Sequence, residues 1–287
     1  MSQHATILRH ELSARNAAYA AQHQFSHVTG CGQLPVIVYH PSDNRPMHGN
    51  FISASYQAIL RRTEWRRRLA KAHCQCYELP RAEYAWRELD SCMSSDALLM
   101  NVFCYPKVTR CKELNFLVGS DIGETPDFGF RPRVPLKTKA IERTEVDMKL
   151  GNMLFEAKLT EGDFQLQNAA VVEQYCGLKE VFEYRKLPRQ GKKYISYQLL
   201  RNVLAAYALD MNFCVLLDAR RPDLLEDWYG IMRCVRLTTL RTRCKVLTWQ
   251  ELASCLPLQL QRFLDVKYGI VAVGLRDSSP AFSTRVT

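Results

Sequence analysis

The sequence of 287 residues lacks several features that would assign it to a class at once. It contains no apolar run that reaches the roughly 20 residues needed to span a membrane. Its first residues, MSQHATILRHELS, carry charged and polar side chains where a signal peptide would have an apolar core. No internal repeat or low-complexity tract is evident, and nothing indicates disorder. We therefore expect a globular protein of the cytoplasm with no membrane partner.

Cysteine is plentiful, but the patterns that make it structural are missing. The eleven cysteines are odd in number and scattered through apolar segments such as Asn212–Leu217, so we expect reduced thiols and no disulfide framework. No second C-x2-C or H-x3-H pair completes a familiar tetrahedral zinc spacing. A zinc-stabilised binding module stays an alternative, with the candidate ligands His27, Cys31, His73, Cys74 and Cys76.

Composition and charge favour a globular protein with a polyanionic partner. Hydrophobic residues make up 47% of the chain, which suffices for a substantial core in one elaborated domain or two small ones. Lysine and arginine number 39 against 29 acidic residues, which gives a net charge of +10 and a pI near 9.1. Such an excess is typical of proteins that bind nucleic acid, although basic proteins without this partner are common.

Two short apolar segments in the middle of the chain predict a β-hairpin. The segments are Thr144–Met148 and Met153–Leu159, and a short turn joins them. Side chains alternate between the two faces of a strand, so Glu156 and Lys158 fall on one face while the apolar residues around them fall on the other. Pairing the two segments could bring both of them next to Asp147.

These three side chains have the chemistry of a metal-dependent nuclease. Mg²⁺ prefers oxygen ligands and keeps several waters, so Asp147 and Glu156 with a phosphate oxygen would suffice to bind it. The carbonyl of Ala157 could add a third protein oxygen. Lys158 could orient the attacking water, favour its deprotonation and stabilise charge on the phosphate. The alternative is a surface hairpin with a charged edge, because the spacing D-x8-E-x-K also arises by chance.

Three stretches, in order along the chain, are similar to one nuclease family. Residues 144–164, TEVDMKLGNMLFEAKLTEGDF, resemble the catalytic hairpin of the PD-(D/E)XK nuclease superfamily, in its restriction-endonuclease-like branch. Residues 94–101, SSDALLMN, are similar to a helix that precedes this hairpin, and residues 197–205, YQLLRNVLA, to a helix that follows it. The resemblance spans roughly Glu88 to Tyr268. It implies an α/β restriction-endonuclease-like core with a mixed central sheet flanked by helices.

The resemblance also implies roles for residues outside the hairpin. The helix after the hairpin would pack near the active site, where Gln198 would hold a water or a metal ligand and Arg201 a phosphate or a carboxylate. Structural pairing of Arg201 with an acidic residue is an equal alternative. The chain departs from the family at Val146, where proline is common, and at Asp96, where the branch often has glutamine. We interpret Asp96 as a first-turn residue of a helix rather than a carboxylate beside the metal, and we keep Glu161 as a further carboxylate candidate there.

Basic residues gather in three segments that could contact a nucleic-acid backbone, and the last of them is Arg189–Lys193. An uninterrupted helix over Ser53–Ala72 would carry Arg66, Arg67 and Arg68, either as a DNA-binding arm or as a solvated helix that packs its aromatic residues on the core. The stretch before the hairpin either tracks phosphates or forms a solvated loop. Its cations are Arg131, Arg133, Lys137 and Lys139.

The remaining patterns supply the other elements of such a core. Ser94 or Ser95 would cap a helix in which Asn101 is expected to be a buried structural amide. We expect helices near Ala5–Gln24 and over Asp96–Phe103, Gln165–Lys186, Ile195–Leu209 and Trp249–Asp265, and strands at Phe213–Leu217 and Cys244–Leu247.

The hypothesis that joins these observations is a Mg²⁺-dependent endonuclease acting on DNA, with Mn²⁺ as a second suitable ion. The alternative is a nucleic-acid-binding protein of the same fold without catalysis, and the intact carboxylates and lysine argue against it. We expect a partly helical N-terminal extension packed on the core over residues 1–85, a nuclease-like domain over 86–277 and a frayed tail over 278–287. A homodimer stays open.

Overall fold

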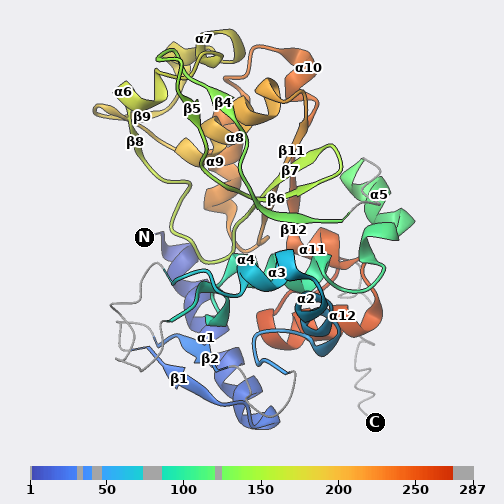
Figure 1. The fold of residues 1–287 in the computed structure, drawn as a ribbon. Coiled ribbons are helices and arrows are strands. Elements are labelled where there is room, and N and C mark those ends of the chain that lie inside the picture. Colours follow the sequence, from blue (N-terminus) through green and yellow to red (C-terminus); the bar gives the residue numbers. More distant parts are fainter. Residues whose placement is uncertain (1, 31–34, 41–46, 74–85, 120–124, 274–287) are drawn as a thin grey trace, which may run out of the picture.

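The computed structural model describes residues 2–30, 35–40, 47–73, 86–119 and 125–273 of the chain (Figure 1). Its α-helices are α1 Gln3–His23, α2 Ser53–Arg61, α3 Thr63–Arg68, α4 Ser95–Phe103, α5 Lys112–Val118, α6 Ala169–Val172, α7 Leu178–Val181, α8 Tyr197–Ala208, α9 Pro222–Met232, α10 Thr238–Arg241, α11 Trp249–Ala253 and α12 Leu258–Tyr268. Its strands are β1 His27–Thr29, β2 Ile37–Tyr39, β3 Asp127–Phe130, β4 Val134–Pro135, β5 Ile141–Glu142, β6 Val146–Leu150, β7 Met153–Ala157, β8 Gln167–Asn168, β9 Arg189–Gln190, β10 Lys193–Tyr194, β11 Asn212–Leu217 and β12 Cys244–Thr248.

A five-stranded mixed sheet organises the molecule. Its strand order is β12-β11-β7-β6-β3. Strands β6 and β7 form an antiparallel hairpin, β3 pairs antiparallel with β6, and β11 pairs parallel with both β7 and β12. Helices flank this sheet, and α1 lies at the N-terminal end of the chain (Figure 1). The arrangement confirms the predicted α/β fold with a mixed central sheet.

Alternation along β7 builds a separate core on each face of the sheet. Phe155 and Ala157 are buried in a cluster with apolar residues of α1, α4, α11 and α12. Leu154 is buried in the other cluster, with apolar residues of α8 and α9. Strand β11 is apolar along most of its length and buried on both faces, as expected for a central parallel strand. The predicted division of the hairpin's side chains between two faces is therefore confirmed.

Helix α1 shares the core with the sheet. Its Leu8 and Leu12 are buried in the same cluster as Phe155, and the predicted helix near Ala5–Gln24 is confirmed. The predicted boundary at residue 85 and the tail over residues 278–287 lie outside the described residues.

The predicted helix over Ser53–Ala72 is wrong as a single element. At Arg62 the backbone is extended, with φ of −111° and ψ of 121°, and it separates α2 from α3. The apolar residues of this segment form two clusters that do not share one face of a single helix. The break at Arg62 allows the cluster of α2 and the cluster of α3 to be buried separately. Ile59 of α2 and Trp65 of α3 are both buried against α4 or its neighbours. Trp65 also donates its indole N–H to the carbonyl of Pro126 at 2.9 Å.

Two other predicted helices are also wrong as single elements. Trp249–Asp265 is split into α11 and α12, because Pro257 has no N–H to continue a helix and instead stands directly before α12. The segment Gln165–Lys186 contains β8, which pairs with β10, and the short helices α6 and α7. The hydrogen bonds of β8 come from β10, so the residues of this segment alone do not predict a strand.

The remaining predicted elements are confirmed to within two residues at either end. Ser94 caps α4 by accepting from the N–H of Ala97 at 3.1 Å. Asn101 is fully buried, and its side chain bonds the main chain at Ile52 and Asn50. Helix α8 and strands β11 and β12 match their predictions.

Lys267 of α12 is a buried amine between α12 and α1. Its side chain is fully buried, and its ammonium donates to Asn16 Oδ1. The amine lies 4.1 Å from the ring centre of Tyr39 and 4.9 Å from that of Tyr19. Burial lowers the pKa of Lys267 to about 7, against an opposing effect of Cys92. Folding is therefore linked to the protonation of this amine.

Replacing Lys267 with methionine is expected to make stability less dependent on pH above 7. The pKa of Lys267 is about 7 in the folded protein and 10.5 ordinarily, so within this interval the unfolded chain binds a proton that the folded chain does not. The free energy of unfolding of the wild type should therefore gain up to about 1.4 kcal/mol per pH unit from this group as the pH rises. Urea unfolding of both proteins between pH 7 and 9 measures the difference. Parallel pH dependences would contradict the prediction.

Candidate functional site

The hairpin of β6 and β7 places Asp147 and Glu156 on the same face of the sheet. Its register pairs Met148 with Phe155 and Lys149 with Leu154. Continued by one residue, this register puts Asp147 opposite Glu156, and residues directly opposite each other share a face. The two carboxylates therefore project to one side, as the alternation of the sequence predicts.

Beyond Met148 the two strands separate. Val146 pairs with Phe130 of β3, and the N–H of Ala157 donates to Asp147 Oδ2 at 2.7 Å. The carboxylate thus takes the place of a main-chain acceptor. Because the N–H and C=O of a strand residue point toward the same neighbour, the carbonyl of Ala157 is also directed at this gap.

Glu156 and Lys158 form a buried ion pair. Lys158 Nζ lies 2.8 Å from Glu156 Oε1, and 1% of Glu156 and 4% of Lys158 remain exposed. The other carboxylate oxygen, Oε2, accepts from Asn202 Nδ2 at 2.7 Å and lies 3.9 Å from Arg201 Nη2. All four side chains are buried. A buried charge is unfavourable without a partner, and here Glu156 is the partner of both Lys158 and Arg201.

Asn202 is a site residue that our sequence analysis missed. It follows Arg201 in the stretch YQLLRNVLA and lies four positions after Gln198. Positions separated by three and four residues share one face of a helix, so the spacing from Gln198 through Arg201 was the available signal. Arg201 Nε donates to Asn202 Oδ1 at 3.1 Å, which fixes the orientation of the amide toward Glu156.

Gln198 and Arg201 lie on the same face of α8 as Asn202. Arg201 Nη2 donates to the carbonyl of Glu145 at 2.9 Å, at the entrance to β6. Arg201 thus joins the strand of Asp147 to helix α8. Gln198 Oε1 is buried and accepts no hydrogen bond within the described part of the chain.

Burial and neighbouring charges set the protonation of the three groups. Burial raises the pKa of Asp147 well above its usual range, and the negative charges of Glu156 and Asp96 raise it further. Burial alone would raise the pKa of Glu156, but Lys158 and Arg201 lower it overall. The attraction of Glu156 likewise raises the pKa of Lys158 against the effect of burial. Lys158 therefore stays protonated, and Asp147 holds a proton more readily than Glu156 does.

Asp96 has the predicted place in the first turn of α4, but it is not a solvated charge. Its side chain is buried, and its Oδ2 contacts Lys71 Nζ at 2.5 Å and Arg68 Nη2 at 3.0 Å. Its charge also acts on Asp147.

The loop over residues 159–162 is held by Arg221. This guanidinium is fully buried and donates to three carbonyls of the loop at 2.7 to 3.3 Å. Glu161 of the loop accepts from Ser95 and from the N–H of Leu159. Glu161 therefore contributes its charge near Lys158 while its own oxygens are engaged within the protein.

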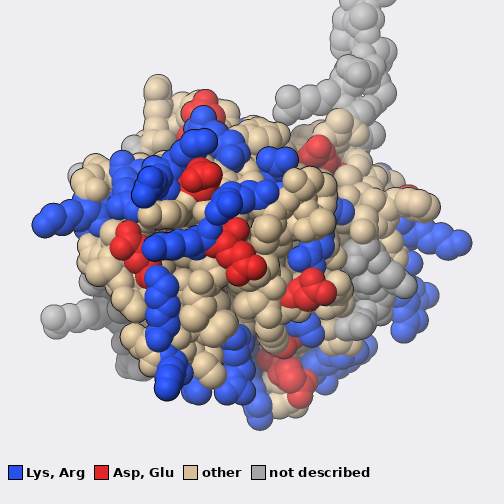
Figure 2. All heavy atoms as spheres, turned by 90° about the horizontal axis from the view of Figure 1, so that it is seen from above, with Lys and Arg blue, Asp and Glu red and all other residues tan. Residues whose placement is uncertain are grey.

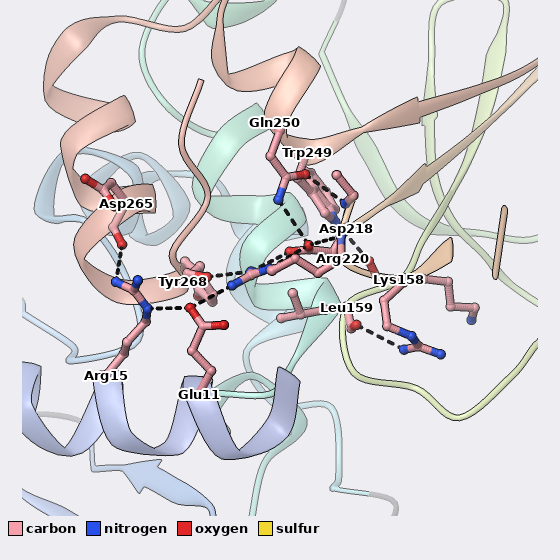
Figure 3. Close-up of polar contacts among 12 residues, drawn as sticks. Glu11, Arg15, Lys158, Leu159, Asp218, Arg220, Trp249, Gln250, Asp265 and Tyr268 are labelled. Carbon is pink, nitrogen blue, oxygen red and sulfur yellow. Dashed lines mark hydrogen bonds and ion pairs between the residues drawn. The ribbon is translucent and has the colours of Figure 1, made fainter. Parts of the chain in front are cut away.

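A polar network fixes the strand ends around Lys158 (Figure 3). Trp249 donates its indole N–H to the carbonyl of Lys158 at 2.9 Å. Asp218, which directly follows β11, contacts Arg220 at 2.6 Å. Arg220 also contacts Glu11 of α1 at 2.9 Å. Helices α1 and α11 therefore hold the carboxyl ends of β7 and β11 in place.

The predicted nucleic-acid-binding residues differ in exposure. Arg66 and Arg67 are exposed, whereas Arg68 points inward to Asp96 and Glu145. The four cations of the segment 131–139 are exposed. Figure 2 shows lysine and arginine side chains crowding the face of the molecule seen from above, with carboxylates between them. Helices α7 and α10 lie at this end of the molecule, and strands β8 and β9 lie toward it (Figure 1).

The zinc alternative receives no structural test at its cysteines, because Cys31, Cys74 and Cys76 lie outside the described residues. Among the residues that are described, no three His, Cys, Asp or Glu side chains are grouped so that they could hold a metal ion. A divalent ion at the hairpin would thus rely on two carboxylates together with main-chain oxygen and water. No helix in the described ranges is long and apolar enough to cross a membrane.

Comparison with known proteins identifies a family. The family described as "Restriction Endonuclease associating with ARP" matches residues 12–269, a span that runs from α1 to the end of α12. No curated protein and no solved structure matches the chain.

Replacing Asn202 with alanine is expected to lower the free energy of unfolding by about 1–3 kcal/mol, because a buried carboxylate oxygen of Glu156 would lose its hydrogen-bond donor. Asn212→Ala is the matched control, since Asn212 donates an exposed hydrogen bond to the carbonyl of Asn152. Its effect should stay within about 0.5 kcal/mol. Urea unfolding measures both, and equal effects would show that the amide of Asn202 does not support Glu156.

Proposed function

The chain belongs to the restriction-endonuclease family described as associating with ARP, and we propose that it is a metal-dependent endonuclease of the PD-(D/E)XK type that hydrolyses DNA phosphodiester bonds. One observation carries the proposal. At the point where β6 leaves β7, Asp147 and Glu156 lie on one face and Lys158 contacts Glu156 at 2.8 Å. Two acidic oxygen donors and a protonated lysine at a strand separation have the chemistry that phosphodiester hydrolysis requires.

The donor set of this site fits Mg²⁺, with Mn²⁺ as a second candidate. Mg²⁺ favours oxygen ligands and keeps several waters. Asp147, Glu156 and the carbonyl of Ala157 would hold it, and the absence of nitrogen and sulfur donors among them disfavours zinc. When bound, the ion would supply Lewis acidity and neutralise charge on the phosphate. The raised pKa of Asp147 is consistent with this role, because a bound cation would stabilise the ionised form of a carboxyl group that burial disfavours.

The remaining residues would position groups around this centre. Lys158 stays protonated, so it would orient the attacking water and stabilise negative charge rather than act as a base. Gln198 Oε1 is buried without a donor from the described residues and would accept a hydrogen bond from a water. Arg201 and Asn202 would keep Glu156 and the strand of Asp147 in place.

Nucleic acid would be held by exposed cations. Arg66 and Arg67 of α3 are candidates for contacts to the phosphate backbone, and so are the exposed cations that precede the hairpin. The latter are Arg131, Arg133, Lys137 and Lys139. The family description names an association with ARP, so we also propose a partner of that kind. A homodimer stays a proposal.

Three conservative substitutions test the site: Asp147→Asn, Glu156→Gln and Lys158→Met. Each is expected to lower Mg²⁺-dependent cleavage of duplex DNA about 100-fold or more, which corresponds to about 2.7 kcal/mol of transition-state stabilisation. The replacements keep the size of each side chain, because both carboxylates also support the fold. Asp147 accepts a hydrogen bond from the N–H of Ala157, and Glu156 neutralises the buried Lys158. Removal of the metal with a chelator should abolish cleavage by the wild type.

Thermal unfolding of each variant separates loss of chemistry from loss of fold. Cleavage by all three folded variants at the wild-type rate would refute the site. A wild type that binds DNA but does not cut it with Mg²⁺ or Mn²⁺ would favour the non-catalytic binding protein instead.

The double substitution of Arg66 and Arg67 with glutamine is expected to weaken DNA binding mainly at low salt. Each lost phosphate contact should flatten the slope of log affinity against log salt concentration by about 0.9 for duplex DNA. Glu156→Gln should keep the wild-type slope, because it removes no exposed cation. The control is the substitution of Arg110 and Lys112 with glutamine, which removes the same charge from an exposed region near α5. If both double variants behave alike, Arg66 and Arg67 belong to a solvated face.

A further inference from the structure

A second group of charges borders Asp147 and comes from the N-terminal part of the chain. Lys71 Nζ and Arg68 Nη2 contact the same oxygen of Asp96 at 2.5 and 3.0 Å. Arg68 Nη1 also contacts Glu145 Oε2 at 2.7 Å. Glu145 directly precedes β6 and stands two positions before Asp147. The group therefore lies beside the proposed metal-binding face.

Helix α3 and the residues after it hold these cations in a fixed place. Trp65 bonds the carbonyl of Pro126, and its ring packs on Phe128 of β3 with ring centres 6.1 Å apart. The carbonyl of Lys71 accepts from the N–H of Glu88 at 2.8 Å. The main chain is thus anchored on both sides of Arg68.

Gly129 in β3 makes room for the guanidinium of Arg68. A Cβ at this position would collide with Arg68 and would lie 3.1 Å from Glu145 Oε2. Its φ of +70° also lies in the left-handed region that favours glycine. The pairing of β3 with β6 skips this residue. Strand β3 is therefore shaped to admit the guanidinium beside Glu145.

Cations outnumber carboxylates in this group. Arg68, Lys71 and Arg131 contact two carboxylates, Asp96 and Glu145, which leaves one positive charge. Lys71 keeps 39% of its side chain exposed, and its ammonium has three donors. Arg68 Nε is buried and donates to no acceptor in the described ranges. The group has both charge and N–H donors to offer an anion.

The carboxylates that contact Arg68 and Lys71 keep both side chains protonated. Burial by itself would lower the pKa of Lys71, but Asp96 raises it overall. Burial by itself would also lower the pKa of Arg68, but Asp96 and Glu145 raise it overall. Both cations therefore stay charged next to the proposed metal ligand.

We propose that Arg68 and Lys71 bind the nucleic-acid phosphate next to the metal-binding face, so that the N-terminal extension completes the active site. The inference rests on the proposed nuclease function. A phosphodiester carries one negative charge, which matches the excess of this group. Arginine binds phosphate oxygens through its fork of N–H groups and lysine as a point charge. Asp96 is then a positioning residue that holds the two cations, rather than a metal ligand.

The experiment replaces Lys71 with methionine, glutamine and arginine, and uses Lys112→Met as a control that removes an exposed lysine of α5. Two readouts are needed. The first is kcat and KM for cleavage of duplex DNA across a range of Mg²⁺ concentrations. The second is the affinity for the same duplex without metal at several salt concentrations, by fluorescence anisotropy. Lys71 is partly exposed, so its variants should fold, and thermal unfolding checks this.

Lys71→Met and Lys71→Gln should lower kcat about 10- to 100-fold at saturating Mg²⁺. They should also flatten the metal-free salt slope by about 0.9, the value for one phosphate contact. Lys71→Arg should keep most of the wild-type kcat and salt slope. Lys112→Met should leave kcat and the salt slope unchanged.

Two outcomes would overturn the inference while Asp147→Asn is inactive and the nuclease function stands. One is a kcat and salt slope of Lys71→Met that equal those of Lys112→Met. The other is full recovery of kcat when the Mg²⁺ concentration is raised, because Lys71 would then act on the metal through Asp96. If the wild type cuts no DNA, the nuclease proposal fails, and an unchanged metal-free salt slope in Lys71→Met would separately exclude the phosphate contact.

Discussion

The separation of β6 from β7 beyond Met148 is the constraint on which the rest of the site depends. A regular antiparallel ladder would engage the main chain of Ala157 with β6 and leave no gap between the strands. Instead, β6 continues along β3, and the carboxylate of Asp147 receives the N–H of Ala157. A buried N–H without an acceptor is unfavourable by about 1–3 kcal/mol, so Asp147 stabilises the same opening that its carboxylate borders. Asp147 therefore has two roles, because it stabilises the separated strands and is also a proposed metal ligand.

The buried pair of Glu156 and Lys158 imposes a second requirement. Removing an ion from water costs several kcal/mol even after relaxation of the protein, and the pair offsets this only with good geometry and further hydrogen bonds. Asn202 and Arg201 supply the partners of the second carboxylate oxygen, and Trp249 bonds the carbonyl of Lys158. Loss of one partner would leave an isolated buried charge, which is unfavourable by about 3–5 kcal/mol. Glu156→Ala would remove both the charge and the hydrogen-bond acceptor of Lys158, whereas Glu156→Gln removes the charge but keeps an acceptor for the ammonium.

The N-terminal part of the chain meets the site from two directions. Helix α1 reaches the end of β11 through Glu11, Arg220 and Asp218 (Figure 3). Helix α3 reaches the entrance of β6 through Arg68 and Glu145. The family match begins at residue 12, within α1, and so includes the connection through Arg68 and all of α1 that follows Glu11. The extension is therefore part of the same structural unit as the sheet.

Local sequence patterns were sufficient to predict the hairpin, the division of its side chains between two faces, the apolar strand β11 and the capped helix α4. These features depend on alternation, helical spacing and capping, which act between residues close in the chain. The same patterns failed at Arg62 and over Gln165–Lys186, where the backbone depends on contacts with residues distant in the sequence. Asn202 and the inward turn of Arg68 were likewise beyond local reasoning. Only the packing of α8 against β7 and of α3 against β3 brings these side chains to Glu156 and Glu145, because the contact partners lie 46 and 77 positions away along the chain.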